Sequence, residues 1–341
     1  MNNISAAVLA AAAGLVVTGA SGFTVIPFLR KVNFGKITEG FEQKWFKSRI
    51  NIPSMGGIMI VLGTAAAVAA VIVTDKLTGG DIIASGSFVP QEMYTKFWSG
   101  LMTAGAFALA GAVDDYAKII NNSSLGLTVS RKYAAMFLIA LSFLLSSYLG
   151  MQGEPYMFIP FAGMTATGLF YWIFGMIFIP AYVNSVNLAD GIDGLCAVNS
   201  LMTCVFLGIA SALRENYGAL ILCVSLAGAS TGFLLWNKKV RAGSIGSLFI
   251  GGVTAAIAYS LGCPLMLILC GASYSVIGIC EIIRVIYYRI NEKRLFKAYP
   301  LQFHFKECGT KEGKIIGIFI IVDIIGGVAS LVLLKAGGFF G

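Results

Sequence analysis

Charged residues are scarce in this chain of 341 residues: only 12% are Asp, Glu, Lys or Arg, whereas 57% are hydrophobic. A soluble domain usually carries about 25% charged residues. The shortage of charge therefore excludes an ordinary soluble domain and indicates an integral membrane protein.

Cysteine pairs with metal-binding spacing are also missing. The seven cysteines show no C-x-x-C spacing, and most of them lie inside apolar runs. We therefore expect neither disulfides nor a zinc site.

Linkers and internal repeats are missing as well. No stretch rich in proline, serine or charge separates the apolar runs, and no repeat period is visible. One integral membrane domain over residues 1–341 is the simplest interpretation.

Long apolar runs are abundant. A helix that crosses about 30 Å of hydrocarbon needs about 20 apolar residues, and ten such runs can be placed. They cover residues 5–28, 54–74, 97–113, 133–150, 157–183, 195–213, 218–236, 247–261, 264–288 and 315–336. The expected fold class is thus an all-α integral membrane protein with about ten transmembrane helices, and its two termini lie on the same side. The first run lacks a charged leader and an obvious cleavage site, so we expect a retained helix.

The basic residues predict the orientation. Only Lys76, Lys96, Arg214 and Lys335 fall on one side of this topology, and the other 20 of the 24 Lys and Arg residues fall on the opposite side. Since loops rich in Lys and Arg stay in the cytoplasm, the N and C termini are expected outside and the long basic loops inside. The net charge of +8 follows mainly from this topology, so we expect no nucleic-acid partner.

An acid pair stands at the cytoplasmic end of the third run. Asp114 and Asp115 are adjacent, so their mutual repulsion makes full ionisation costly unless a cation lies close by. Lys118 follows Asp114 by four residues and lies on the same helix face, where it can neutralise that carboxylate or hold a phosphate oxygen. A polar helix end that meets lipid headgroups is the plainer interpretation.

A second polar group follows the fifth run. Asn184, Asn187, Asp190 and Asp193 recur at every third position, with Gly191 and Gly194 between apolar runs. Carboxylate and amide oxygens suit Mg²⁺, which often bridges carboxylates to substrate phosphates. A capped helix start would account for an Asp here, but the regular spacing favours a magnesium-dependent site for a phosphate-bearing substrate.

Several motifs occur in one order along residues 45–316. They are Pro53-Ser54-Met55-Gly56-Gly57, Asp114-Asp115-x-x-Lys118, Gly126-Leu127-Thr128 with Lys132, Asn184-x-x-Asn187-x-x-Asp190-Gly-x-Asp193-Gly-Leu195, Gly232-Phe233-Leu234 with Asn237, Gly246-Ser247-Leu248, Lys293-Arg294-Leu295-Phe296-Lys297, and Pro300-Leu301 with His304-Phe305, Gly309, Glu312 and Lys314. In this set and order, the sequence resembles the polyprenyl-phosphate N-acetylhexosamine-1-phosphate transferases. The last group favours the phospho-N-acetylmuramoyl-pentapeptide transferase branch.

The resemblance implies an enzyme of the bacterial inner (plasma) membrane that requires Mg²⁺. It would transfer phospho-MurNAc-pentapeptide from UDP-MurNAc-pentapeptide to undecaprenyl phosphate, giving lipid I and UMP for peptidoglycan synthesis. It also implies ten spans, outward termini, a cytoplasmic site and a homodimer.

Residue roles are carried over position by position. The expected catalytic residues are Asp114, Asp115, Asp193 and His304. The expected substrate-binding residues are Lys118, Lys132, Asn184, Asn187, Asp190, Asn237 and Arg241, and the expected metal ligands are Asp193, Asp115 and Asp190. The sequence does not distinguish which of the acids binds the metal.

The chain departs from the family pattern at two places. Where the family usually reads Phe-Met-Gly-Asp-x-Gly-Ser, residues 241–247 read Arg-Ala-Gly-Ser-Ile-Gly-Ser. Ser244 thus replaces an expected Mg²⁺ ligand, and Arg241 replaces an aromatic residue expected to stack on uracil. Where the family has three histidines, Gln302 and Phe303 precede His304, which is the single histidine of the chain.

Three interpretations of the function stay open. The chain is either an active transferase with a modified nucleotide site, or a catalytically impaired paralogue that binds the lipid carrier or a cell-wall partner, or a transferase for a different UDP-sugar. A transporter would require inverted repeats and ionisable residues at the bilayer midplane. Only Asp323 has such a place, and an isolated Asp there more often pairs within the bundle.

Overall fold

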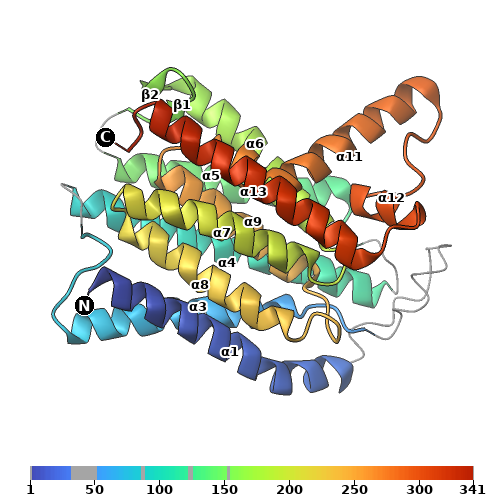
Figure 1. Cartoon of the computed structure of the whole chain (residues 1–341), viewed down its shortest axis with the longest axis horizontal. Coiled ribbons are helices and arrows are strands. Elements are labelled where there is room, and N and C mark those ends of the chain that lie inside the picture. Colours follow the sequence, from blue (N-terminus) through green and yellow to red (C-terminus); the bar gives the residue numbers. More distant parts are fainter. Residues whose placement is uncertain (1, 32–51, 86–88, 122–125, 152–153, 341) are drawn as a thin grey trace.

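The computed structural model describes residues 2–31, 52–85, 89–121, 126–151 and 154–340. The described residues form ten helices of 18 residues or more, two short helices and one small hairpin (Figure 1). The long helices are α1 (Asn3–Lys31), α3 (Gly57–Leu77), α4 (Pro90–Ile120), α5 (Val129–Gly150), α6 (Leu169–Ala189), α7 (Leu195–Leu213), α8 (Tyr217–Leu234), α9 (Gly243–Ser260), α11 (Ala272–Asn291) and α13 (Glu312–Ala336).

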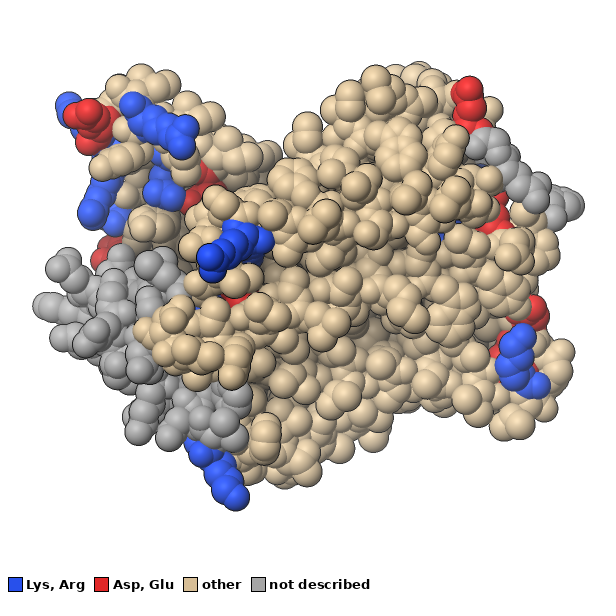
Figure 2. Space-filling view, turned by 180° about the vertical axis from the view of Figure 1, so that it is seen from behind, with Lys and Arg blue, Asp and Glu red and all other residues tan. Residues whose placement is uncertain are grey.

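The expected class is confirmed: the chain is an all-α, multi-pass membrane protein. Eight of the long helices are long and apolar enough to cross a membrane, and α4 and α11 are the two outside that group. Helix α1 begins and α13 ends at the same end of the bundle, and the hairpin lies beside the end of α13 (Figure 1). Seen from behind, the middle of the molecule is almost free of charge, and Lys and Arg side chains gather at the end where α11 projects (Figure 2). We call this the basic end. The basic residues between 32 and 51, which the orientation also uses, lie outside the described residues.

Helix α9 forms the centre of the bundle. Every residue from Ser244 to Tyr259 is buried, and the helix packs along α4, α6 and α3. Small residues let membrane helices approach closely. At the start of α3, a Cβ on Gly57 would lie 2.2 Å from the Cα of Gly246, so these two helices cross almost backbone to backbone.

Two apolar runs differ from the prediction. The run at 157–183 begins with the antiparallel hairpin β1 (Tyr156–Ile159) and β2 (Gly163–Ala166), and only then continues as α6.

The run at 264–288 is interrupted at Gly271, where α10 (Met266–Cys270) ends and α11 begins. Asp323 of α13 is fully buried and accepts the backbone N–H of Ser273 at 2.8 Å. Asp323 thus pairs within the bundle, close to the point where α11 turns away from it (Figure 1). After α11 the chain folds back through α12 (Leu301–Glu307) at the basic end.

Candidate active site

The acid pair lies in the last turns of α4, and both carboxylates take part in hydrogen bonds and ion pairs. Asp114 is 3% exposed: its Oδ1 accepts the backbone N–H of Leu127 at 3.0 Å, and its Oδ2 accepts the Ser244 hydroxyl at 2.6 Å. Asp115 is 1% exposed, and its Oδ2 accepts the backbone N–H of Ile245 at 3.1 Å. The end of α4 is therefore fastened to the start of α9, whose free N–H groups suit a carboxylate.

Lys118 is the central cation of this group. Its Nζ lies 2.8 Å from Asp114 Oδ2, 3.0 Å from Asp115 Oδ1 and 2.7 Å from Ser244 Oγ. The predicted neutralisation of Asp114 by Lys118 is thus present, and the same ammonium also serves Asp115. This shared counter-ion offsets the repulsion between the two adjacent buried carboxylates.

Lys132 and Asn187 extend the group toward α6. The Lys132 ammonium donates to Asn187 Oδ1 at 2.6 Å and lies 3.9 Å from Asp114 Oδ2. The Asn187 amide in turn donates to Ser247 Oγ at 2.7 Å and to Ser244 Oγ at 3.3 Å. We call Asp114, Asp115, Lys118, Lys132, Asn187 and Ser244 the acid-lysine cluster. The structure thereby joins residues from α4, α5, α6 and α9.

Asp190 borders this cluster from the end of α6. Its Oδ2 accepts the backbone N–H of Gly243 at 2.6 Å. Gly243 has φ of +71°, and a Cβ there would lie 2.5 Å from Asp115 Oδ2, so glycine is required at this position. Removal from water raises the pKa of Asp190 to about 7, although the charge of Arg241 and the Gly243 N–H oppose the rise.

A small crevice adjoins Asp190. It is lined by Asp190, Asp193, Asn237 and Arg241, among others. Gly194 has φ of +84°, and a Cβ there would lie 2.4 Å from the Asn237 amide, so this turn also depends on glycine. The structure thus brings together four of the residues expected to bind substrate or metal.

Asn184 and His304 lie apart from the acid-lysine cluster. Asn184 stands one turn before Asn187 on α6, and among the described residues it is Asn187 that reaches the serines of α9. His304 lies on α12, where its Nδ1 accepts the Lys297 N–H at 3.2 Å and its ring lies beside Phe296.

The two residues before His304 make the contact with the site instead. The Gln302 amide donates to the carbonyl of Leu188 at 2.6 Å, and the Phe303 ring lies so close to Gly191 that a Cβ there would clash. Both side chains are buried. The departure from the histidine pattern therefore produces a neutral contact that holds α12 against the Asn187–Asp193 turn.

The sequence marked Ser247 through the motif Gly246-Ser247-Leu248, but it did not single out Gly243 or the backbone N–H groups of Leu127 and Ile245. Backbone donors leave no trace in a sequence motif. The small residues Ala242, Gly243 and Ser244 were the available signal for Gly243, because they permit close approach to a carboxylate.

A Mg²⁺ site at the expected ligands Asp115, Asp190 and Asp193 requires their carboxylates to face a common position. Among the residues that the structure describes, no group of three or more His, Cys, Asp or Glu side chains is arranged around a common metal position. Asp115 and Asp190 nevertheless flank the same glycine, Gly243. Hard carboxylate oxygens of this kind suit Mg²⁺, so the donor set fits on the Asp190 side, while Lys118 occupies the Asp114–Asp115 side.

These features define a class, a multi-pass membrane protein with a buried acid-lysine cluster at its basic end. The profile of glycosyl transferase family 4 matches residues 97–262. The phospho-N-acetylmuramoyl-pentapeptide-transferase of Clostridium perfringens strain 13 is 31% identical over 324 residues, which are 93% of this chain and 95% of that relative. The enzymes of the same name from Bacillus thuringiensis Al Hakam and Caldicellulosiruptor bescii are 30% and 29% identical over 92% and 91% of this chain, which cover 95% and 92% of those relatives. The chain therefore belongs to the phospho-N-acetylmuramoyl-pentapeptide-transferase family, whose members are phospho-sugar transferases.

Proposed function

We propose that this protein transfers phospho-MurNAc-pentapeptide from UDP-MurNAc-pentapeptide to undecaprenyl phosphate, giving lipid I and UMP. The observation that carries the proposal is the 31% identity to the Clostridium perfringens enzyme along almost the whole of both chains. The acid-lysine cluster supports it, because phosphoryl transfer relies on charge neutralisation and positioning.

In the proposed step, a phosphate oxygen of the lipid attacks the phosphorus that carries the sugar. The bond from that phosphorus to the oxygen of the UMP phosphate breaks, and UMP leaves with the electron pair. Lys118 and Lys132 are proposed to bind the phosphates, and Asp114 and Asp115 to orient these lysines and the lipid phosphate.

Asp190, Asp193 and Asp115 are the proposed holders of Mg²⁺. When bound, the ion would bridge these carboxylates to the substrate phosphates and neutralise negative charge. Asn237 and Arg241, which line the same crevice as Asp190, are proposed to contact the nucleotide. Roles for Asn184 and His304 stay predictions.

A second candidate is favoured by the contacts of Lys118. Its ammonium is already bonded to Asp114, Asp115 and Ser244. A self-neutralised group of this kind has less need of a metal ion, which would suit a catalytically impaired paralogue that still binds the lipid carrier.

The test uses the purified full-length chain in detergent with Mg²⁺, undecaprenyl phosphate and UDP-MurNAc-pentapeptide, and it measures UMP release. We expect turnover in the parent and its loss in Asp115→Asn. No turnover in the parent together with turnover in Ser244→Asp would support the impaired paralogue. Turnover that is unchanged in Asp115→Asn would refute the assigned site, and faster turnover with UDP-GlcNAc would indicate another UDP-sugar as the substrate.

A further inference from the structure

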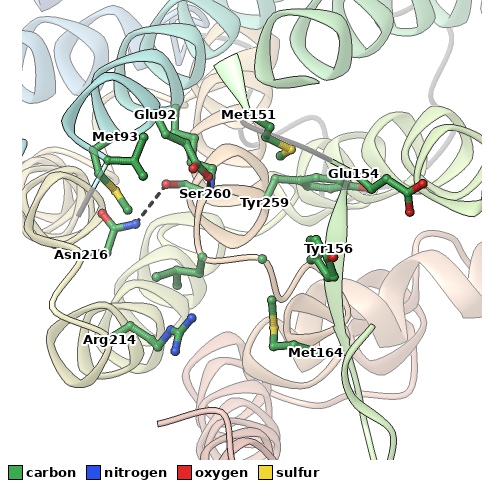
Figure 3. Close-up of a pocket in the computed structure, with 14 residues that line it drawn as sticks. Glu92, Met93, Met151, Glu154, Tyr156, Met164, Arg214, Asn216, Tyr259 and Ser260 are labelled. Atoms are coloured by element: carbon green, nitrogen blue, oxygen red, sulfur yellow. Dashed lines mark hydrogen bonds and ion pairs between the residues drawn. The ribbon is translucent and has the colours of Figure 1, made fainter. Parts of the chain in front are cut away.

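A second cavity lies at the end of the bundle opposite the acid-lysine cluster. It has a volume of about 520 Å³, within the range of small-molecule sites. The start of α4, the hairpin, the α7–α8 turn and the end of α9 all contribute to its wall (Figure 3). Glu92 in this wall and Asp115 stand 23 residues apart on α4, which is about 35 Å along a helix. The cavity is thus separate from the proposed active site.

Among the described residues, the charged side chains of the cavity leave one cation without a carboxylate partner. Lys96 forms an ion pair with Glu92 at 2.6 Å. Arg214 reaches in from the α7–α8 turn, where it donates one N–H to the Phe339 carbonyl at 3.0 Å and lies 4.7 Å from the centre of that ring. No carboxylate of the described residues lies within 4 Å of Arg214. Its guanidinium has five N–H donors, so donors remain for an anion.

The distribution of basic residues along the chain points the same way. Only four Lys and Arg residues fall on this side of the topology, and two of them, Lys96 and Arg214, line this one cavity. Positive charge is disfavoured on the outer side of a membrane protein. A cation that is kept there, next to a cavity and without an acidic partner among the described residues, is best explained by an anionic ligand.

The rest of the wall suits the apolar part of such a ligand. Met93, Met151 and Met164 surround the opening, and Figure 3 shows their side chains on different sides of the cavity. Methionine is flexible and adapts to irregular apolar groups. The carboxylate of Glu154, at the rim, points away from the cavity (Figure 3), so it does not oppose an anion at Arg214.

We propose that this outer cavity binds an amphiphile with a singly charged phosphate head, which pairs with Arg214 while its apolar part lies against the methionines. Arg–phosphate pairs gain strength from charge-assisted hydrogen bonds. A membrane phosphodiester lipid has both parts, whereas a soluble phosphate ester offers the same phosphate oxygens to Arg214 with more negative charge and no apolar part.

The experiment is a titration of the purified full-length chain by native mass spectrometry with dioleoylphosphatidylglycerol, dioleoylphosphatidylcholine and sn-glycerol 3-phosphate. We expect phosphatidylglycerol to bind more tightly than phosphatidylcholine. Met164→Glu places a negative charge in the cavity and is expected to weaken phosphatidylglycerol binding about tenfold, in line with the loss of one charge-assisted contact. Its matched control Met164→Gln is polar but uncharged and keeps the binding.

A second pair of variants tests the cation itself. Arg214→Gln is expected to weaken phosphatidylglycerol binding to a similar extent, whereas Lys335→Gln, which removes an outer cation away from the cavity, is not. Equal binding of the two lipids by the parent, or equal binding by Met164→Glu and Met164→Gln, would overturn the proposal. Competition by glycerol 3-phosphate at similar affinity assigns a soluble ester as the source, and its failure to compete assigns the lipid.

Discussion

Replacement of Ser244 by aspartate should make the stability of this protein depend on Mg²⁺. The Ser244 hydroxyl donates to Asp114 Oδ2 at 2.6 Å, and it lies 2.7 Å from the ammonium of Lys118. In Ser244→Asp this hydrogen bond is replaced by a contact between two carboxylates. At an effective dielectric constant of about 20, like charges at this distance repel by about 6 kcal/mol, and the attraction to Lys118 is of about the same size.

The two Coulomb energies nearly cancel, so other costs decide the outcome. The variant loses one hydrogen bond and buries a third carboxylate beside Asp114 and Asp115, which together should destabilise the metal-free protein by about 3 kcal/mol. A divalent ion can remove this penalty. If Mg²⁺ at 10 mM exceeds its dissociation constant about 100-fold, its binding raises the free energy of unfolding by about 2.7 kcal/mol.

The assay is thermal unfolding in detergent from 0 to 10 mM Mg²⁺. The controls are the parent and Ser244→Asn, whose side chain matches aspartate in size but carries no charge. We expect Ser244→Asp to unfold at the lowest temperature without Mg²⁺ and to gain the most from it. If Ser244→Asn responds to Mg²⁺ as strongly as Ser244→Asp, the added charge is not what recruits the ion, and the electrostatic reasoning is refuted.

Three further predictions concern the same end of the molecule. Because the pKa of Asp190 is raised to about 7 from an ordinary value of 3.8, the folded state holds a proton that the unfolded state loses, so metal-free stability should fall between pH 4 and 7. Thermal unfolding of Asp190→Asn should lack this slope, and an equal slope in both proteins would contradict it. Lys118→Met leaves Asp114 and Asp115 buried without their shared counter-ion and should cost about 3–5 kcal/mol by chemical unfolding, whereas Arg131→Met, at an exposed position, should cost less than about 1 kcal/mol. Gln302→Leu leaves the Leu188 carbonyl without its donor and should raise the KM for the UDP-sugar more than it lowers kcat, as measured by UMP release; a change in kcat alone would argue against a positioning role for α12.

Much of the membrane fold follows from the sequence because the bilayer imposes a simple rule. Backbone groups in hydrocarbon must bond within the segment, so a long apolar run forms a helix. The run at 157–183 is the instructive exception. Its first part contains Pro160, Gly163 and Gly168 and lies at the end of the bundle, where water can satisfy the turn of a hairpin.

The sequence singled out the residues of the acid-lysine cluster, but only some of their contacts could be predicted. Adjacent acids and a lysine four residues later indicated the pair of Asp114 and Lys118, since helix geometry alone places them together. The contact of Ser244 with that pair joins positions 130 residues apart in sequence. Such a contact depends on how α4 and α9 pack, and one sequence does not specify that packing.

The charges of the acid-lysine cluster explain how Ser244 is tolerated. Asp114 and Asp115 carry two negative charges, and Lys118 and Lys132 carry two positive charges, so the group is neutral without a metal ion. An aspartate at position 244, as the family pattern has it, would leave a net negative charge among buried side chains, which a divalent cation would relieve. Serine therefore removes the need for a metal at this point of the cluster. The carboxyl that still favours a cation is Asp190, on the other side of Gly243, and any Mg²⁺ that serves catalysis in this chain should depend on Asp190 more than on the Asp114–Asp115 pair.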